Sequence, residues 1–272
     1  MNYEILCRKV IEASSSVGDF QRNEAGKFSV DKIETKGIHD FVSYVDKNSE
    51  KILVDSLKSI LPEAGFITEE GTVKYNGESL KWIIDPLDGT TNFIHGIPVY
   101  SISIALMEGD ETLLGVVYEP NLKECFYAWK NSPAYLNGKT IHVSKCQSVK
   151  ESLIATGFPY NDFSLLKKYL SAFEYLLMNS HGARRIGSAA IDLAYVACGR
   201  FEAFYEYNLK PWDVAGGAFI VKQAGGIVTD FNNHDNYIFG KELIATNSLI
   251  QGEFINIIQK YMLKRLPISD DK

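Results

Sequence analysis

Hydrophobic and polar positions follow two different periods along this chain. Apolar side chains recur every three to four positions from Asn2 to Gly18 and from Asp46 to Leu61, which predicts two amphipathic helices. Pro62 ends the second helix, because proline disfavours helical backbone in the residue before it. Short apolar or alternating runs follow and predict strands, with an antiparallel meander from Val99 onward. These strands are Ala64 to Thr68, Leu80 to Ile84, Val99 to Leu106, Thr112 to Tyr118 and Cys125 to Trp129.

The second half of the chain alternates between helical and extended patterns. Helices are predicted over Asp162 to Asn179, Gly187 to Cys198, Val214 to Ala224 and from the cap Asn247 to about Leu263, and strands over Phe201 to Tyr205 and Ile227 to Phe231. This order favours stacked layers of mixed sheet and helix over a doubly wound parallel sheet. No linker or repeat interrupts the chain, so we expect one domain over residues 1–272, built from two packed halves of roughly 1–145 and 146–272.

Composition narrows the class of protein. Hydrophobic residues make up 46% of the 272 positions and charged residues 23%, as in folded globular proteins. The formal net charge of −6 argues against a broad basic surface for nucleic acid. The longest apolar stretch, Val99 to Met107, is too short to span a membrane. The four cysteines have no paired spacing and the N-terminus is charged, so we expect reduced thiols, no secretion and a cytoplasmic location.

The segment from Trp82 to Phe93 is the most informative, because an apolar strand there runs into a turn with two carboxylates, a proline and a glycine. Pro86 fixes its φ and Gly89 permits unusual backbone angles, so the turn can aim Asp85 and Asp88 at one point beside a free carbonyl. Hard divalent cations such as Mg²⁺ prefer such oxygen ligands. The alternative is an ordinary Asp-Gly turn in which Asp88 caps backbone N–H groups.

Carboxylates stand at other element ends too, and each has a structural alternative. Glu69 and Glu70 are adjacent on a predicted strand end, so at most one can join the turn, and such pairs are more often solvated. Asp46 and Asp213 each stand at the start of a predicted helix, where either can act as an N-cap. The small residues at 215–217 would let the second of these helices begin close to another backbone or to a ligand.

Several segments together carry a family resemblance: Asp85 to Phe93, Trp212 to Gly217, and Ala224-Gly225-Gly226. They resemble the signatures of the inositol monophosphatase family of Mg²⁺-dependent, lithium-sensitive phosphatases. The similarity runs in the same order from Asp40 to Gly226 and so covers nearly the whole chain. Arg184 to Ala197 is similar to the bacterial inositol-1-monophosphatase group. The resemblance implies a mixed α+β fold, a layered α-β-α-β-α sandwich, and a homodimer.

The resemblance also implies roles for individual residues. The metal ligands would be Glu69, Asp85, Asp88, Asp213 and the backbone carbonyl of Leu87. The catalytic set would be Glu69, Thr90 and the supporting Asp46. Substrate contacts would come from Asp88, Gly89, Thr90, Gly187, Ser188, Ala189, Glu206 and Asp213.

The activity implied by the resemblance is hydrolysis of a phosphate monoester, with inositol 1-phosphate as the expected substrate. Two or three Mg²⁺ ions would activate a water without a phosphoenzyme, and Li⁺ would inhibit. Other substrates stay open: fructose 1,6-bisphosphate, histidinol phosphate and, ranked last because Thr91 stands where lysine is usual, a 3′-phosphoadenylate. A regulatory protein that binds RNA or transcription machinery is the rival, with Arg184-Arg185 as a local partner surface unless this pair is structural or lies at a dimer interface.

Overall fold

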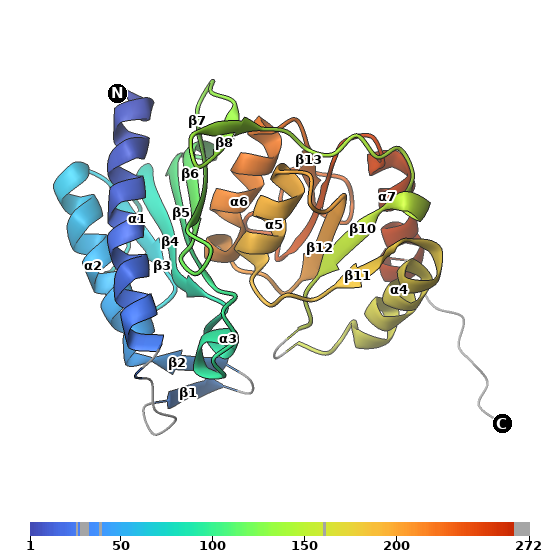
Figure 1. Ribbon diagram of the computed structural model, residues 1–272, viewed down its shortest axis with the longest axis horizontal. Helices are drawn as coiled ribbons and strands as arrows, with labels where there is room; N and C mark the ends of the chain where they lie inside the picture. Colours follow the sequence, from blue (N-terminus) through green and yellow to red (C-terminus); the bar gives the residue numbers. More distant parts are fainter. Residues whose placement is uncertain (26, 28–32, 38–39, 160–161, 264–272) are drawn as a thin grey trace.

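Alternating layers of helix and sheet make up the molecule (Figure 1). The computed structural model describes residues 1–25, 27, 33–37, 40–159 and 162–263, with backbone alone for 33–37 and 40–42. Helices α1 (Tyr3–Ala25) and α2 (Tyr44–Ile60) form one outer layer on a seven-stranded sheet. Helices α5 (Ala189–Ala197) and α6 (Pro211–Gln223) lie between this sheet and a five-stranded one, and α4 (Leu166–Asn179) and α7 (Gln251–Ile258) cover its far face. The predicted α-β-α-β-α sandwich is confirmed.

The seven-stranded sheet holds the predicted meander. Its strand order is β3-β4-β5-β6-β7-β8-β9, with β3 parallel to β4 and every other pair antiparallel. The bounds are β3 Gly65–Thr68, β4 Leu80–Asp88, β5 Ser101–Glu108, β6 Glu111–Glu119, β7 Glu124–Trp129, β8 Ala134–Leu136 and β9 Lys139–Ile141. The short helix α3 (Thr90–Ile94) directly follows β4. Strands β8 and β9 were not predicted, because three residues are too few to show a period.

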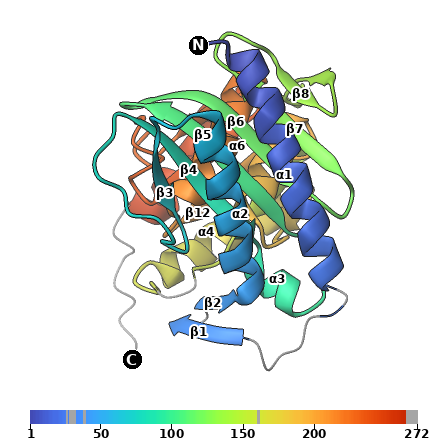
Figure 2. The same ribbon diagram turned by 90° about the vertical axis from the view of Figure 1, so that its left-hand side faces the viewer.

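The five-stranded sheet comes from the second half of the chain. Its order is β11-β10-β12-β14-β13, with β10 parallel to both neighbours and β14 antiparallel to both of its own. The bounds are β10 Leu153–Thr156, β11 Gly182–Arg184, β12 Ala203–Tyr207, β13 Ile227–Thr229 and β14 Glu242–Thr246. A single 3₁₀ turn, η2 (Val149–Glu151), precedes β10. A separate hairpin of β1 (Ile33–Gly37) and β2 (Asp40–Ser43) lies below the first residues of α2 (Figure 2).

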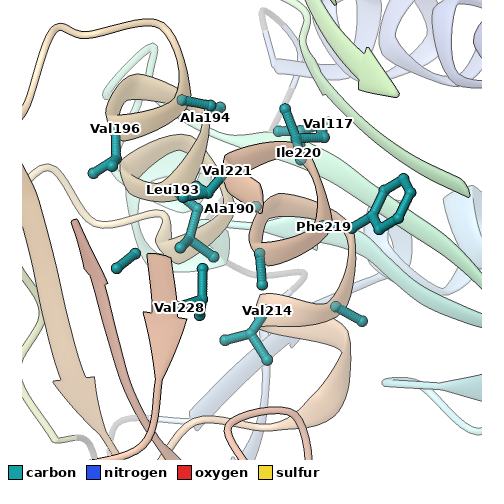
Figure 3. Close-up of a cluster of buried hydrophobic side chains, with 14 of the residues drawn as sticks. Val117, Ala190, Leu193, Ala194, Val196, Val214, Phe219, Ile220, Val221 and Val228 are labelled. Carbon is teal, nitrogen blue, oxygen red and sulfur yellow. The ribbon is translucent and has the colours of Figure 1, made fainter. Parts of the chain in front are cut away.

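Hydrophobic side chains fill each space between layers. Strand β5 serves two of these cores, because Ile102 and Ile104 face α1 and α2 whereas Ala105 and Met107 face the inner helices. In the central core, Leu193 of α5 and Val221 of α6 lie against Val228 of the five-stranded sheet (Figure 3). This packing holds α5 and α6 between the two sheets.

Several helix ends differ from the prediction. Helix α1 continues past Gly18 to Ala25, because Gly18 is needed for close packing: a Cβ atom there would collide with the ring of Tyr118. Helix α2 begins at Tyr44, so Ser43 is the N-cap and Asp46 is the third helical residue. Similarly, α4 begins at Leu166, four positions after the predicted start, and α6 begins at Pro211, three positions before it.

The last helix also starts later than predicted. Asn247 accepts the N–H of Ile250 at 3.2 Å and so caps the turn that precedes α7, rather than the helix itself. Helix α7 then continues into a π-helical turn, η3 (Gln259–Leu263). None of the described helices is both long and apolar enough to cross a membrane.

Candidate active site

Strand β4 carries two of the predicted carboxylates at its end. Asp85 pairs with Ser103 and Asp88 with Ser101, so β4 holds one extra residue between them and bulges. The bulge changes the direction of the strand, and Oδ1 of Asp85 accepts the N–H of Leu87 at 2.9 Å. Both carboxylates therefore belong to one tight turn, as the sequence predicted.

Gly89 ends this turn and begins α3. Its φ is +101°, a conformation that glycine adopts without strain. A Cβ atom there would lie 3.1 Å from the carbonyl oxygen of Val99 and 3.2 Å from that of Gly187. The backbone of the turn thus lies directly against the segment that leads into α5.

The third aspartate comes from the start of α6. The N–H of Lys210 donates to Oδ2 of Asp213 at 2.7 Å, so Asp213 closes the helix N-terminus from the third helical position, whereas the N-cap itself is Lys210 and not Asp213. Two glycines bring this helix onto the sheet. A Cβ atom at Gly216 would lie 2.9 Å from the carbonyl oxygen of Ile104, and one at Gly115 would lie 2.6 Å from the carbonyl oxygen of Gly216. The backbone of α6 is therefore in direct contact with the backbone of β5 and of β6.

These elements line one open cavity of about 230 Å³. All the predicted metal ligands and substrate contacts line it, as does Thr90. The lining residues include Glu69, Asp85, Leu87, Asp88, Gly89, Thr90, Gly187, Ser188, Ala189, Glu206 and Asp213. Asp46 lies behind the wall and reaches the cavity through Thr90. Glu70 does not line it; its N–H donates to Oε2 of Glu50 at 2.7 Å.

Thr90 and Asp46 form a hydrogen-bonded pair beside the metal-ligand candidates. Oγ1 of Thr90 lies 2.9 Å from Oδ1 of Asp46 and 3.0 Å from the carbonyl oxygen of Leu87. The other Asp46 oxygen accepts the N–H and the hydroxyl of Ser43, at 2.8 and 2.6 Å. Asp46 is fully buried, so its partners hold its carboxylate, and through it Thr90, in one orientation.

Asp88 is tied to the start of α5. Its Oδ2 accepts the hydroxyl of Ser188 at 2.6 Å and the N–H of Ala190 at 2.7 Å. The positive end of the helix dipole favours a carboxylate at this place. Glu206, from β12, faces the same region, and a Cβ atom at residue 157 would collide with its carboxylate, so Gly157 makes room for it.

Burial and mutual repulsion raise the pKa of the clustered carboxyl groups. Burial is the larger cause for Asp85, and the charges of Glu69, Asp88 and Asp213 raise its pKa further. Burial raises the pKa of Asp88 to about 6, and burial together with the charge of Asp88 raises that of Asp213 to about 7. The charges of these carboxyl groups therefore act on one another across the cavity.

The sequence matches the model of a known protein family. The model of the inositol monophosphatase family matches residues 6–263. The chain belongs to the inositol monophosphatase family. Its curated relatives include the Putative Nus factor SuhB of Neisseria meningitidis, which is 41% identical over 92% of this chain and 97% of the relative. The Fructose-1,6-bisphosphatase/inositol-1-monophosphatase of Thermotoga maritima is 40% identical over 85% of this chain and 88% of the relative.

Solved structures of this family agree in fold. The extragenic suppressor protein SuhB of Bartonella henselae gives a TM-score of 0.88 at 36% identity, covering 93% of this chain and 98% of that one. The inositol monophosphatase of Anabaena gives a TM-score of 0.87 at 30% identity, covering 99% of both chains. The family resemblance seen in the sequence is thereby confirmed.

The donor set of this family member fits Mg²⁺ in its chemistry. All the candidate ligands are oxygens, which hard cations prefer, and the carboxylates repel one another without a cation. Within the described residues, Oδ1 of Asp88 and Oδ1 of Asp213 make no hydrogen bond. No three His, Cys, Asp or Glu side chains in that part of the chain are already grouped to hold one ion. The carboxylates therefore share a cavity without forming a closed ligand cage.

Sequence reasoning missed several polar members of the cavity wall, among them Arg185 and Asp192. The sequence offers Arg185 as a partner surface, a dimer contact or a structural residue, yet it lines the cavity. Burial raises the pKa of Asp88 and of Glu206, and the charge of Arg185 partly opposes this rise. Asp192 follows Ser188 by one helical turn, so it lies on the same face of α5. This spacing is the signal that would have found it.

Proposed function

We propose that the protein is a Mg²⁺-dependent phosphatase that hydrolyses inositol 1-phosphate to inositol and phosphate. The observation that carries this proposal is the shared cavity: the four acidic metal-ligand candidates, which come from β4, from α6 and from the residue after β3, line it together with Thr90. The name of the Thermotoga maritima relative, which includes inositol-1-monophosphatase, supports the same substrate.

Glu69, Asp85, Asp88 and Asp213, with the carbonyl of Leu87, would hold two or three Mg²⁺ ions. When bound, these ions would neutralise the charge of the phosphate and lower the pKa of a water molecule. A phosphate monoester is otherwise among the slowest substrates to hydrolyse in water. On the same proposal, Li⁺ inhibits by competing for this site.

The chain's own residues position the nucleophile. Thr90 donates its proton toward Oδ1 of Asp46 and the carbonyl of Leu87, so a lone pair of its Oγ1 is free to accept a hydrogen bond from the attacking water. The carboxylate of Glu69 would take up the proton of that water. Water attacks directly, and no phosphoenzyme forms. The first turn of α3 brings the N–H groups of Gly89 and Thr90 to the phosphate.

Phosphate release from a panel of esters tests the proposal. The panel contains inositol 1-phosphate, fructose 1,6-bisphosphate and histidinol phosphate, each with Mg²⁺, with a chelator, and with added Li⁺. We expect Mg²⁺-dependent release, inhibited by Li⁺, with the highest kcat/KM for inositol 1-phosphate. A higher kcat/KM for either of the other esters would make that ester the substrate in place of inositol 1-phosphate. Absence of release from all three would reject the phosphatase.

A second candidate function is a role in transcription. The Escherichia coli Nus factor SuhB is 40% identical over 78% of this chain and 80% of the relative, a similarity equal to that of the named phosphatase. A variant that lacks Mg²⁺-dependent turnover but still forms a complex with RNA polymerase would favour this function. The two functions can also coexist, in which case both measurements would be positive.

A further inference from the structure

Helix α2 carries a stripe of buried polar side chains along the first half of its length. Asp46, Ser49 and Glu50 lie three and four positions apart, so they share one face of the helix, and all three are fully buried. Asp46 contacts Thr90, and Ser49 accepts a hydrogen bond from Nε2 of Gln21 at 3.2 Å. Glu50 contacts a different segment, the loop that follows β3.

The Glu50 carboxylate accepts three hydrogen bonds from this loop. Its Oε2 accepts the N–H of Glu70, and its Oε1 accepts both the N–H and the hydroxyl of Thr72, each at 2.7 Å. Gly71, between the two N–H donors, has a φ of +63°, a conformation that lets neighbouring N–H groups converge on one anion. Because a buried carboxylate is costly without hydrogen bonds, these contacts tie the loop to α2.

The same loop carries Glu69, one of the metal-ligand candidates. Among the described carboxylates that line the cavity, Glu69 is the one that belongs to neither a helix nor a strand. Its N–H donates to the carbonyl oxygen of Ile84 at 3.3 Å, which is the last contact of this backbone with β4 before the loop. The described residues 69–79 then contain no helix or strand, so Glu50 supplies the next anchor for the loop.

We propose that Glu50 is a positioning residue: by holding the N–H groups of Glu70 and Thr72, it fixes the place from which Glu69 reaches the cavity. This inference rests on the proposed function, in which Glu69 binds Mg²⁺ and takes up a proton. It adds a residue that itself contacts neither the metal nor the substrate. A reacting group displaced by about 1 Å can lower a rate about 100-fold, so a contact one residue away from Glu69 affects turnover.

Glu119 supplies a matched control, because it is a buried glutamate that holds a different loop. It is 2% exposed and accepts the N–H groups of Asn121 and Leu122, in a turn between β6 and β7 that does not line the cavity. Substitution of Glu119 should therefore weaken the fold without changing the site. A loss that is specific to Glu50 then reports on Glu69 rather than on general stability.

Calorimetric titration of the metal-free protein with Mg²⁺, followed by initial rates, makes the comparison. In Glu50→Ala we expect the Kd for Mg²⁺ to rise about 10-fold or more, and kcat for inositol 1-phosphate at saturating Mg²⁺ to fall about 10- to 100-fold. Glu50→Gln keeps the length and one acceptor oxygen, so both losses should be about 3- to 10-fold. Glu119→Ala and Glu119→Gln should lower the unfolding temperature but leave Kd and kcat unchanged.

Amide hydrogen exchange shows whether the loop has loosened. In both Glu50 variants the N–H groups of Glu70 and Thr72 should exchange faster than in the unmodified protein, because their acceptor is lost or weakened. Faster exchange with unchanged Kd and kcat would overturn the positioning role. Equal losses in the Glu119 variants, or unchanged exchange, would overturn it as well. If Glu50→Ala does not fold, Glu50→Gln decides by the same criteria.

Failure of the proposed function would give a different result. The unmodified protein would then neither bind Mg²⁺ nor release phosphate, which rejects both proposals. If only the role of Glu50 is wrong, the unmodified protein binds Mg²⁺ and releases phosphate, and the Glu50 variants do so equally well.

Discussion

The hydroxyl of Thr90 and the carboxylate of Asp46 are hydrogen-bonded at 2.9 Å although 44 positions separate them in the chain. The same carboxylate accepts two hydrogen bonds from Ser43 and so also closes the start of α2. One buried side chain therefore caps a helix and orients the hydroxyl beside the metal-ligand candidates. The N-cap position predicted for Asp46 belongs to Ser43, yet the Asp46 carboxylate both closes the helix start and accepts the Thr90 hydroxyl.

Loss of the Thr90 hydroxyl should reduce turnover without weakening substrate binding. In Thr90→Val we expect kcat to fall about 100-fold or more, because the attacking water loses its hydrogen-bond partner. KM for inositol 1-phosphate should change little. Thr90→Ser is the matched control, since it restores the hydroxyl and should recover most of kcat. Equal kcat in Thr90→Val and the unmodified protein would remove Thr90 from the mechanism.

Asp88→Asn should nearly abolish turnover and leave the fold intact. The amide oxygen can still accept the hydrogen bonds from Ser188 and Ala190, so α5 should keep its cap. The lost negative charge would weaken Mg²⁺ binding, and a deficit of a few kcal/mol corresponds to roughly 100-fold or more in rate. Phosphate release and thermal unfolding, measured together, test this. Full activity in the variant would refute the metal assignment.

The carboxyl cluster should make the metal-free protein less stable as the pH rises. The folded-state pKa is raised to about 7 for Asp213 and about 6 for Asp88, against an ordinary value of 3.8, chiefly by burial. The folded protein therefore binds more protons than the unfolded chain between about pH 4 and 7, and stability falls as pH rises through this window.

Thermal unfolding in a chelator at pH 5 and at pH 8 measures this effect. We expect the midpoint to be several degrees lower at pH 8, and added Mg²⁺ to recover more stability at pH 8 than at pH 5. Asp213→Asn should flatten the dependence on pH. A midpoint that rises from pH 5 to pH 8 in the chelated protein would contradict the raised pKa values.

The contact of α6 with the sheet should tolerate no added methyl group. In Gly216→Ala the new Cβ atom would lie 2.9 Å from the carbonyl oxygen of Ile104 and would push α6 away. We expect a loss of about 1–3 kcal/mol in the free energy of unfolding, together with reduced kcat because Asp213 moves with the helix.

Gly252 provides the matched control, since a Cβ atom at this position of α7 would meet no atom within 4 Å. Gly252→Ala should raise stability by up to about 1 kcal/mol, as expected for alanine in a helix, and leave kcat unchanged. Chemical denaturation and initial rates measure both. Equal stability in Gly216→Ala and the unmodified protein would argue against a rigid contact.

The homodimer implied by the family resemblance is still a prediction. Helix α4 carries solvent-exposed apolar side chains that a partner subunit could cover: Leu170 and Leu177, both 47% exposed and two turns apart on one face, and Met178 at 78%. Light scattering should give twice the mass of 30.5 kDa. A monomeric mass at micromolar concentration would contradict the prediction.

Features encoded by neighbouring residues were predictable. The turn from Asp85 to Gly89 combines proline, glycine and two carboxylates within a few positions, and Asp213 stands before small residues at a helix start. Arg185 was not predicted, because its place in the cavity depends on how the segment before α5 meets the end of β4, which no local pattern records. Strands β10, β11 and β14 were missed because three to five residues are too few to show a clear alternation.

The backbone contact between Gly115 and Gly216 has a consequence for how the candidate ligand set can vary. Asp213 lies on helix α6 and Asp85 lies on the sheet. Backbone atoms in direct contact, rather than interlocking side chains, set the distance between this helix and the sheet. Side chains elsewhere in the interior can then be replaced by others of similar volume, with some loss of stability. The distance between Asp85 and Asp213, across which a cation would bind, would stay the same.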